Sequence, residues 1–296
     1  MKIKPNLVRG AFASLLLPTI ICQPSTIFAA TTIDAANRYA YGANLGWLNW
    51  VADTNNGAVI GEYVCSGCLY SANVGWINLG SGSSANGIYY QNNSAADFGV
   101  NQDGLGNLRG YAWGANIGWL NFETNGAPKV DLLNGKLSGY VWSANCGWIS
   151  LSNAVAYVQT DTIQKGALAP DGLPIAWLLL NFGTTNINAN ADPTGKGMTI
   201  GQDYLAGTNP TNANSILRIT AENFASGGTA ANLTWDSVPT RFYHLQKATN
   251  LTTQVWSDSG LGLVSPSAGP TTTAGFTDTT APARFYRVQA VRPLTP

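Results

Sequence analysis

The sequence predicts a mainly β protein with an N-terminal domain of β-hairpin repeats, a short helical connector and a C-terminal β-sandwich. Three observations support this prediction. An aromatic motif occurs four times within residues 31–157, apolar residues follow a helical pattern within residues 158–214, and short alternating segments occupy residues 215–296. The chain has 296 residues, which leaves room for two or three small domains.

The repeated motif reads GYAWGANIGWLNF in its third copy, at residues 110–122. The other copies occupy residues 39–50, 68–79 and 139–151. Their shared tryptophans are 29, 43 and 29 residues apart, and this spacing predicts an architecture in which each unit needs neighbours to bury its apolar face. The longer step contains residues 80–93, which are rich in Gly, Ser and Asn and predict a surface loop.

Each copy is expected to form a β-hairpin around its Ala-Asn-x-Gly sequence. The Asn can hydrogen-bond the backbone ahead of it, and the Gly supplies the positive φ that tight turns need. If Ala115 pairs with Gly118, directly opposed residues share one face of the sheet. That apolar face would consist of Tyr111, Trp113, Leu120 and Phe122. Trp119 and Asn121 would then lie on the other face, and a bulge at the glycine would shift this register by one residue.

The shared tryptophans have two interpretations. They are Trp47, Trp76, Trp119 and Trp148. One interpretation is a packing layer between adjacent hairpins, because aromatic side chains mostly serve cores. The other is an exposed platform for stacking on sugar rings, with neighbouring amides from Asn49, Asn78 and Asn121. The fourth copy has Ser150 in place of this Asn, which argues against a strict ligand code.

These four copies resemble the YAWSENIGWINF-type repeats of bacterial secreted proteins. The resemblance rests on the four motif copies and implies export, but it implies no particular activity or ligand.

The N-terminus independently predicts export. Residues 1–30 begin with the basic side chains of Lys2, Lys4 and Arg9, continue with a short apolar run and end in small residues, as secretory signal peptides do. The apolar run is too short to span a bilayer. Because Ile21 precedes Cys22, where a lipobox would have a small residue, we expect Cys22 to be removed with the signal peptide. The mature protein is therefore expected to be secreted or at the cell surface, without a transmembrane segment.

Composition excludes one class of partner. Charged residues make up 10% of the chain, and 15 Lys and Arg balance 15 Asp and Glu. Nucleic-acid binding needs a basic surface to neutralise phosphates, so we expect no nucleic-acid partner.

Three cysteines remain after signal removal. Cys65 and Cys68 form a CxxC sequence, but in a strand they would point to opposite faces, which argues against a redox pair. Packing, or an export-compartment disulfide for which Cys146 is a candidate partner, explains them better. The one histidine, His244, belongs to another region and is expected to be a surface or packing residue.

The connector combines a helix signal with a loop rich in Asp and Gly. Pro174 opens a helical apolar pattern that runs to Phe182, and Pro is favoured at such a start. The whole segment resembles the DGLPDAW…DPDGDGLTNLQEYLAGTDP segment, a thrombospondin type 3-like or dockerin-like calcium motif of bacterial secreted proteins. The matching residues are 171–174, 176, 177, 192, 193, 195, 197, 199, 202, 204–208 and 210.

The resemblance implies a calcium loop, and this sequence departs from it. Candidate ligands are Asp192, Thr194, Met198 and Asp203. Calcium prefers several carboxylates at alternate loop positions. Here Thr194 and Lys196 replace the middle carboxylates, and the Lys196 ammonium would sit where the cation should bind. The alternative is a helical connector that has kept its fold without the ion.

The last segment is similar to a fibronectin type III-like module. Short alternating strands over residues 215–296 predict a β-sandwich. The resemblance rests on the sequences LTW at residues 233–235, Trp256, FTDT at residues 276–279 and RFYRV at residues 284–288. It implies a modular surface role.

No G-x-S-x-G, Walker, H-E-x-x-H or Rossmann signature is present, so we expect a protein that is not an enzyme and has no cofactor, with calcium as the one candidate ion. Three hypotheses follow. The leading one is a non-catalytic secreted or cell-surface structural or adhesion protein. The second is an extracellular carbohydrate-binding protein, which needs at least two exposed, coplanar repeat tryptophans. The third is a secreted glycoside hydrolase, which needs two carboxylates in a cleft. Expected partners are extracellular polysaccharides or cell-surface components.

Overall fold

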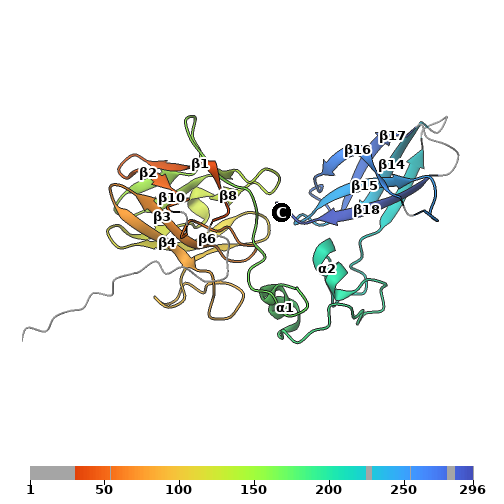
Figure 1. The fold of residues 1–296 in the computed structure, drawn as a ribbon, viewed down its shortest axis with the longest axis horizontal. Helices are drawn as coiled ribbons and strands as arrows, with labels where there is room; N and C mark the ends of the chain where they lie inside the picture. Colours follow the sequence, from red (N-terminus) through yellow and green to blue (C-terminus); the bar gives the residue numbers. More distant parts are fainter. Residues whose placement is uncertain (1–30, 54, 225–228, 254, 279–283, 296) are drawn as a thin grey trace, which may run out of the picture.

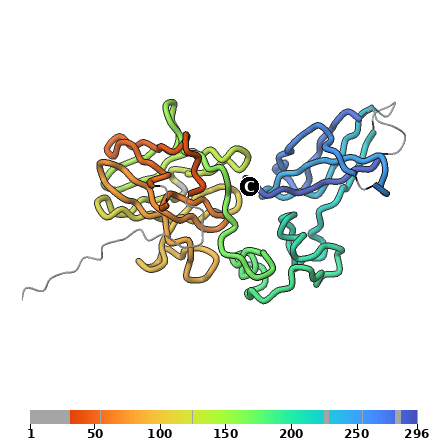
Figure 2. The backbone as a smooth tube through the Cα atoms, in the orientation of Figure 1, coloured from red at the N-terminus to blue at the C-terminus, as the bar shows by residue number. Residues whose placement is uncertain are grey.

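The protein is mainly β, as predicted, with three successive regions (Figure 1). A computed structural model describes residues 31–53, 55–224, 229–253, 255–278 and 284–295. The predicted signal peptide and Cys22 lie outside these ranges. The backbone trace shows the repeat domain on one side and the C-terminal region on the other, with the connector running below and between them (Figure 2). In the described part of the chain, no helix has the length and hydropathy that a membrane-crossing segment requires.

The four motif copies form four antiparallel hairpins. Their strands are β1 (Ile33–Gly42) with β2 (Gly46–Asn49), β3 (Ser66–Ser71) with β4 (Gly75–Ser81), β6 (Leu108–Gly114) with β7 (Gly118–Asn121), and β10 (Tyr140–Ser143) with β11 (Gly147–Ser150). Shorter elements join them: β5 (Val100–Gln102), η1 (Thr124–Gly126), β8 (Lys129–Val130), β9 (Leu137–Ser138) and β12 (Val158–Thr160).

The hairpins join into one sheet that closes on itself. Neighbouring hairpins pair through β2–β3, β4–β6 and β7–β10. The ring is completed because β11 pairs with β1, where Tyr41 lies opposite Ser150 and Gly42 opposite Ile149. The N-terminal half of β1 also pairs with β12. The result is a closed, barrel-like antiparallel sheet with one hairpin in each quarter.

The predicted hairpin register is wrong by one residue. Trp113 pairs with Trp119 and Gly114 with Gly118, instead of Ala115 with Gly118. The turn is a three-residue loop. The Ile117 N–H donates to the Gly114 carbonyl at 3.2 Å, and Gly118 adopts φ +72°. This is the three-residue turn that ends in a left-handed glycine bulge. The shift sends every side chain of one strand to the opposite face from the predicted one.

The corrected register separates an apolar interior from an aromatic exterior. Ala112, Leu120 and Phe122 point inward and are at most 1% exposed, whereas Trp113 and Trp119 share the outer face. The residues equivalent to Leu120 in the other copies are Leu48, Ile77 and Ile149. These side chains are also at most 1% exposed. Burial of each of these Leu and Ile side chains stabilises the folded state by about 1.5–3 kcal/mol, so the filled interior holds the closed sheet together.

One end of the interior is plugged by the residue before each turn glycine. These residues are Leu45, Val74, Ile117 and Cys146. Leu45, Ile117 and Cys146 are at most 6% exposed, and Val74 packs against the same core. The sequence position that varies within Ala-Asn-x-Gly is therefore an apolar plug.

The asparagines of the same turns form a ring of hydrogen bonds around this plug. Each side-chain amide donates to the backbone carbonyl of the plug residue in the preceding hairpin. The four bonds are Asn73 to Leu45 at 3.0 Å, Asn116 to Val74 at 3.0 Å, Asn145 to Ile117 at 3.0 Å, and Asn44 to Cys146 at 3.3 Å. The last bond joins the first hairpin to the fourth, so the ring closes where the sheet closes. We call these four bonds the asparagine ring.

The connector contains two helices with well-defined ends. α1 (Ile175–Phe182) follows Pro174, as predicted, and ends at Gly183 in the left-handed conformation. α2 (Ile200–Ala206) begins with a reciprocal pair of hydrogen bonds between Thr199 and Gln202, a capping box. Trp177 of α1 packs edge-on against Tyr204 of α2 at 5.4 Å between ring centroids, so the helices share one small core.

The C-terminal region is a sandwich of two three-stranded sheets, in agreement with the predicted β-sandwich. The strands are β13 (Ile219–Phe224), β14 (Ala230–Asp236), β15 (Phe242–Ala248), β16 (Ser257–Val264), β17 (Thr271–Thr277) and β18 (Phe285–Val291). The sheet orders are β13-β14-β17 and β16-β15-β18. Trp235 and Tyr243, from different sheets, meet in the core at 5.6 Å between ring centroids.

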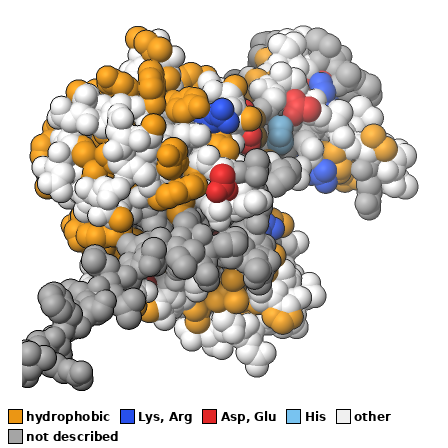
Figure 3. Space-filling model, turned by 60° about the vertical axis from the view of Figure 1, so that its left-hand side comes forward, with side chains coloured by type: hydrophobic (Ala, Val, Ile, Leu, Met, Phe, Trp, Pro, Cys, Tyr) orange, Lys and Arg blue, Asp and Glu red, His pale blue; other side chains and the backbone are white. Residues whose placement is uncertain are grey.

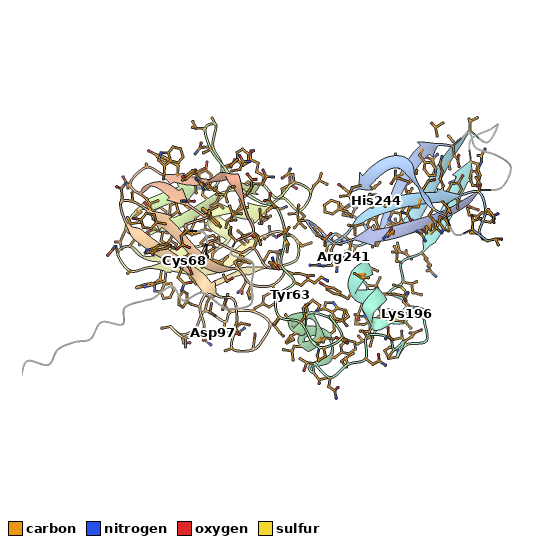
Figure 4. The ribbon with its side chains drawn as sticks, viewed as in Figure 1. Tyr63, Cys68, Asp97, Lys196, Arg241 and His244 are labelled. Carbon is orange, nitrogen blue, oxygen red and sulfur yellow. The ribbon has the colours of Figure 1, made fainter. Side chains whose placement is uncertain are left out.

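Tyr204 ties the three regions together. Its hydroxyl donates to Glu62 Oε2 of the repeat domain at 2.7 Å, and Arg292 Nη2 donates to the same oxygen at 2.8 Å. Arg241 of the sandwich donates to the backbone carbonyls of Tyr204 and Leu205, which end α2 and lack helical partners. Figure 4 shows Arg241 at this junction, with Tyr63 of the repeat domain nearby. The regions are therefore docked by buried polar contacts.

The asparagine ring predicts a specific sensitivity to loss of an amide donor. Asn73→Asp replaces the donor to the Leu45 carbonyl by a carboxylate, which can only accept, so we expect the free energy of unfolding to fall by about 1–2 kcal/mol. Urea denaturation followed by near-ultraviolet circular dichroism measures this change.

The matched control is Asn93→Asp, the same chemical change at an exposed loop residue. It should change the stability by less than about 0.5 kcal/mol. Equal effects of the two substitutions would contradict a closing role for the ring.

Candidate functional site

An aromatic belt surrounds the outside of the closed sheet. In each hairpin the motif tryptophan contacts the aromatic residue opposite it on the partner strand. The four pairs, with centroid separations, are Tyr41–Trp47 at 5.0 Å, Tyr70–Trp76 at 5.1 Å, Trp113–Trp119 at 4.7 Å and Trp142–Trp148 at 4.9 Å. These eight residues define the aromatic belt. Inclined ring pairs of this kind fix one another's orientation.

The belt tryptophans are substantially exposed. Trp47, Trp76, Trp119 and Trp148 are 46%, 43%, 45% and 47% exposed, whereas Trp50, in the interior, is 1% exposed. This exposure does not fit the interpretation of the shared tryptophans as a packing layer between adjacent hairpins. Each motif tryptophan precedes an inward-pointing Leu or Ile and therefore points outward, and the bulge brings the opposite aromatic residue to the same outer face. Hydrophobic side chains are gathered over the repeat domain in the space-filling view, with few charges among them (Figure 3).

The belt is not one flat platform. Each aromatic pair stands on its own hairpin, and the hairpins occupy successive quarters of a closed sheet. The four pairs therefore face different directions around the domain. The hypothesis of coplanar tryptophans is therefore replaced by one of four separate binding positions. We call each of the four aromatic pairs an aromatic station.

The predicted amides do lie beside the belt. Asn49, Asn78 and Asn121 are the cross-strand neighbours of an aromatic residue in the next hairpin, and Asn121 lies opposite Trp142. Each also has a structural role, because its side-chain oxygen accepts a backbone N–H two residues later, at 3.0, 2.7 and 2.6 Å. Asn49 and Asn121 are the last residues of β2 and β7, whereas Asn78 lies within β4. In all three, this bond leaves the amide nitrogen as a donor beside the ring.

A hollow of about 210 Å³ lies on the belt beside the fourth hairpin. Its lining residues are Asn121, Glu123, Asn125, Gly126, Trp142 and Trp148. Two of the lining residues, Asn125 and Gly126, belong to η1, which follows the third motif copy and forms a wall of the hollow.

The wall is fixed by close backbone packing. A Cβ on Gly126 would stand 1.9 Å from the Tyr140 carbonyl oxygen and 3.1 Å from a ring carbon of Trp148, so only glycine fits there. Glu123 is held as well, because its Oε1 accepts the Gly110 N–H at 2.9 Å. Sequence reasoning missed Glu123, Asn125 and Gly126. A usable signal was that an acidic residue follows only the third copy of the motif.

The candidate calcium loop is filled by a lysine. Lys196 Nζ lies 2.8 Å from Asp203 Oδ1 and donates to the carbonyl oxygens of Asn209, Asn212 and Ser215 at 2.8, 3.3 and 3.0 Å. The side chains of Lys196 and Asp203 are each 1% exposed. The ammonium thus occupies a cage of oxygen atoms of the kind that a hard cation prefers. Figure 4 shows Lys196 beside α2.

The other predicted ligands are not gathered around this cage. The Asp192 carboxylate accepts the backbone N–H groups of Gly197 at 2.7 Å and Lys196 at 3.2 Å. These bonds lower the pKa of the carboxyl, and the bond from Gly197 has the larger effect. Thr194 donates to Asp192 at 3.4 Å, and Met198 is half-buried just before α2. In the described ranges, no group of three or more His, Cys, Asp or Glu side chains is arranged to hold a metal ion.

Two of the described cysteines, Cys65 and Cys146, serve packing. Cys65 and Cys146 are free and buried, so the expected disulfide with Cys146 is not formed. Cys146 instead plugs one end of the closed sheet. Burial raises the pKa of the Cys65 thiol to about 12, which makes it a poor nucleophile. Cys68, on β3, is fully buried and disulfide-bonded.

The acidic residues of the interdomain pocket are engaged in structural bonds. A pocket of about 170 Å³ at the junction is lined by both Glu62 and Asp103. Glu62 is bound by Tyr204 and Arg292, as described above. Asp103 accepts two loop N–H groups and the Asn107 amide, so it stabilises a turn. His244 pairs with Asp258 at 3.2 Å on the sandwich surface.

Comparison with known proteins adds no relative. The chain matches no protein family, no curated protein and no solved structure.

The lysine cage predicts a connector that is insensitive to calcium. Adding calcium or a chelator should leave the melting temperature of the protein unchanged, because the ammonium already occupies the oxygen cage.

Lys196→Ala should lower the free energy of unfolding by about 3–5 kcal/mol, because it leaves the buried Asp203 carboxylate unpaired. Differential scanning calorimetry measures both effects. Lys129→Ala, at an exposed lysine, is the control, and a calcium-dependent rise in the wild-type melting temperature would contradict this account.

The Cys65 thiol predicts a loss of stability at high pH. The folded-state pKa, about 12, lies above the ordinary value of 9.0, so the folded protein favours the protonated thiol. This contribution is complete below pH 9.0 and is lost as the pH rises toward about 12. Cys65→Ser should therefore flatten the decline of stability over this range, as urea titrations at several pH values would show. An unchanged pH profile in the variant would contradict the assignment.

Proposed function

We propose that this is a non-catalytic, exported adhesion protein whose repeat domain binds extracellular polysaccharide through the aromatic belt. The observation that carries the proposal is the outward orientation of the four motif tryptophans. Keeping large indoles nearly half exposed in four separate copies does not serve the interior, which is filled by other side chains.

The chemistry of the belt supports this ligand class. Sugar rings present apolar C–H faces and polar hydroxyl edges, and a binding surface for them needs aromatic faces with a few placed polar groups. Each station offers an indole, a second aromatic ring and, in three of the four copies, an asparagine amide. Stations in several directions around one domain suit a long or branched polymer, because several weak contacts act together.

The proposed adhesive role also agrees with the rest of the chain. The predicted signal peptide supports export, and the buried contacts of Tyr204 with Glu62 join the sandwich and connector to the repeat domain as an accessory unit. The acidic side chains at the junction are engaged in structural bonds, which supports a role without catalysis.

The proposal predicts that binding to insoluble polysaccharide depends on the belt. Purified protein incubated with cellulose, chitin and other insoluble glycans should be retained on at least one of them. The double variant Trp119→Ala/Trp148→Ala should lose retention by about tenfold or more, since stacked aromatic anchors dominate such interfaces.

The control is Trp256→Ala, which removes a half-exposed indole from the sandwich, where it stacks with Arg287. This variant should bind like the wild type. Retention of the belt double variant at the wild-type level, with both proteins shown to be folded by circular dichroism, would contradict the proposal.

A further inference from the structure

The four aromatic stations are not equivalent. Two stations pair a tyrosine with the motif tryptophan, and two pair tryptophan with tryptophan. At the third station, Phe98 packs edge-on against Trp119, with 5.2 Å between ring centroids, and so covers part of the indole. The fourth station has two indoles and the hollow beside η1.

The two indoles of the fourth station form a corner. The planes of Trp142 and Trp148 are inclined by 61°, with 4.9 Å between their centroids. A ring lying on one indole would therefore meet the other at its edge. Gly126 packs against Trp148 and Glu123 is anchored to Gly110, so the corner is preformed, which reduces the entropy lost when a ligand binds.

The polar groups that line the hollow are two asparagine side chains and the carboxylate of Glu123. Asn121 uses its side-chain oxygen to accept the Glu123 N–H at 2.6 Å, which leaves its amide nitrogen as a donor. Glu123 uses Oε1 to accept the Gly110 N–H, which leaves Oε2 as an acceptor. None of the lining residues is a lysine or arginine. The hollow therefore carries one negative charge and no positive one.

This charge selects among sugars. A carboxylate accepts hydrogen bonds from hydroxyl and ammonium groups, and these charge-assisted bonds are stronger than neutral ones. It repels the carboxylate of a uronic acid, and a like charge next to a half-buried group disfavours binding. A hexose hydroxyl is compatible with the hollow, and a protonated amino sugar complements it.

We propose that the hollow of the fourth station is the principal sugar subsite, and that Glu123 makes it selective for neutral and amino sugars over acidic ones. This inference rests on the proposed function and adds the location and the ligand class. Trp142 and Trp148 supply the stacking surface, and Asn121 supplies a hydrogen-bond donor.

The experiment is calorimetric titration of the purified protein with three defined hexasaccharides at mildly acidic pH. The probes are cellohexaose, the glucosamine hexamer of chitosan and a galacturonate hexamer. We expect the glucosamine hexamer to bind about fivefold more tightly than cellohexaose, as one exposed ion pair allows, and the galacturonate hexamer to show no binding.

The internal repeats supply the matched control. Trp148→Ala should weaken binding of cellohexaose by about tenfold or more, and Trp47→Ala, the equivalent change on the first hairpin, by less than about twofold. Glu123→Gln keeps an acceptor for the Gly110 N–H but removes the charge. It should bring the affinities for the glucosamine hexamer and cellohexaose to within about twofold of each other, with cellohexaose affinity unchanged.

Each contrary result has a distinct meaning. Equal losses in Trp47→Ala and Trp148→Ala would overturn the location of the subsite. An unchanged glucosamine preference in Glu123→Gln, or tight binding of galacturonate by the wild type, would overturn the selectivity. Retention on insoluble glycan without binding of any hexamer would overturn this inference and leave the proposed function standing. Failure of both assays would overturn both.

Discussion

The closure of the sheet depends on the asparagine ring. Each turn amide reaches back to the plug carbonyl of the preceding hairpin, and the bond from Asn44 to Cys146 returns the chain to its start. A carbonyl at the end of a closed sheet has no strand partner, so a side-chain donor satisfies it. The same turn supplies the donor and the apolar plug. One short sequence, Ala-Asn-x-Gly, therefore sets both the hydrogen bonds and the packing at this end of the domain.

Closure has a direct consequence for the surface. Once the ring is complete, one face of every strand is enclosed and must be filled, and side chains such as Leu120 and Phe122 fill it. Because side chains alternate along a strand, Trp119 points outward next to the inward Leu120, and the turn bulge at Gly118 brings Trp113 to the same outer face. The exposed indoles are thus a result of the register and not of a poorly packed core. In the connector, the Lys196 ammonium fills the oxygen cage beside Asp203 from within the chain itself.

Much of this architecture follows from local sequence. The repeat copies, the helix after Pro174 and the β-sandwich are predicted by periodicity and turn chemistry, because these depend on neighbours within a few residues. The register was mispredicted, since a one-residue bulge at Gly118 is hard to distinguish from a tighter turn. Long-range features were out of reach. The pairing of β1 with β11, the packing of η1 against Trp148 and the carbonyl oxygens around Lys196 all join segments that no local pattern connects.

The central claim is that closure of the hairpin ring turns the motif tryptophans outward. Oxidative footprinting of the native protein, read by mass spectrometry at each tryptophan, tests it most directly. The account predicts fast modification of Trp47, Trp76, Trp119 and Trp148, and protection of Trp50, which points inward. Modification of Trp50 as fast as Trp47, in protein that remains folded, would contradict the register and the belt together.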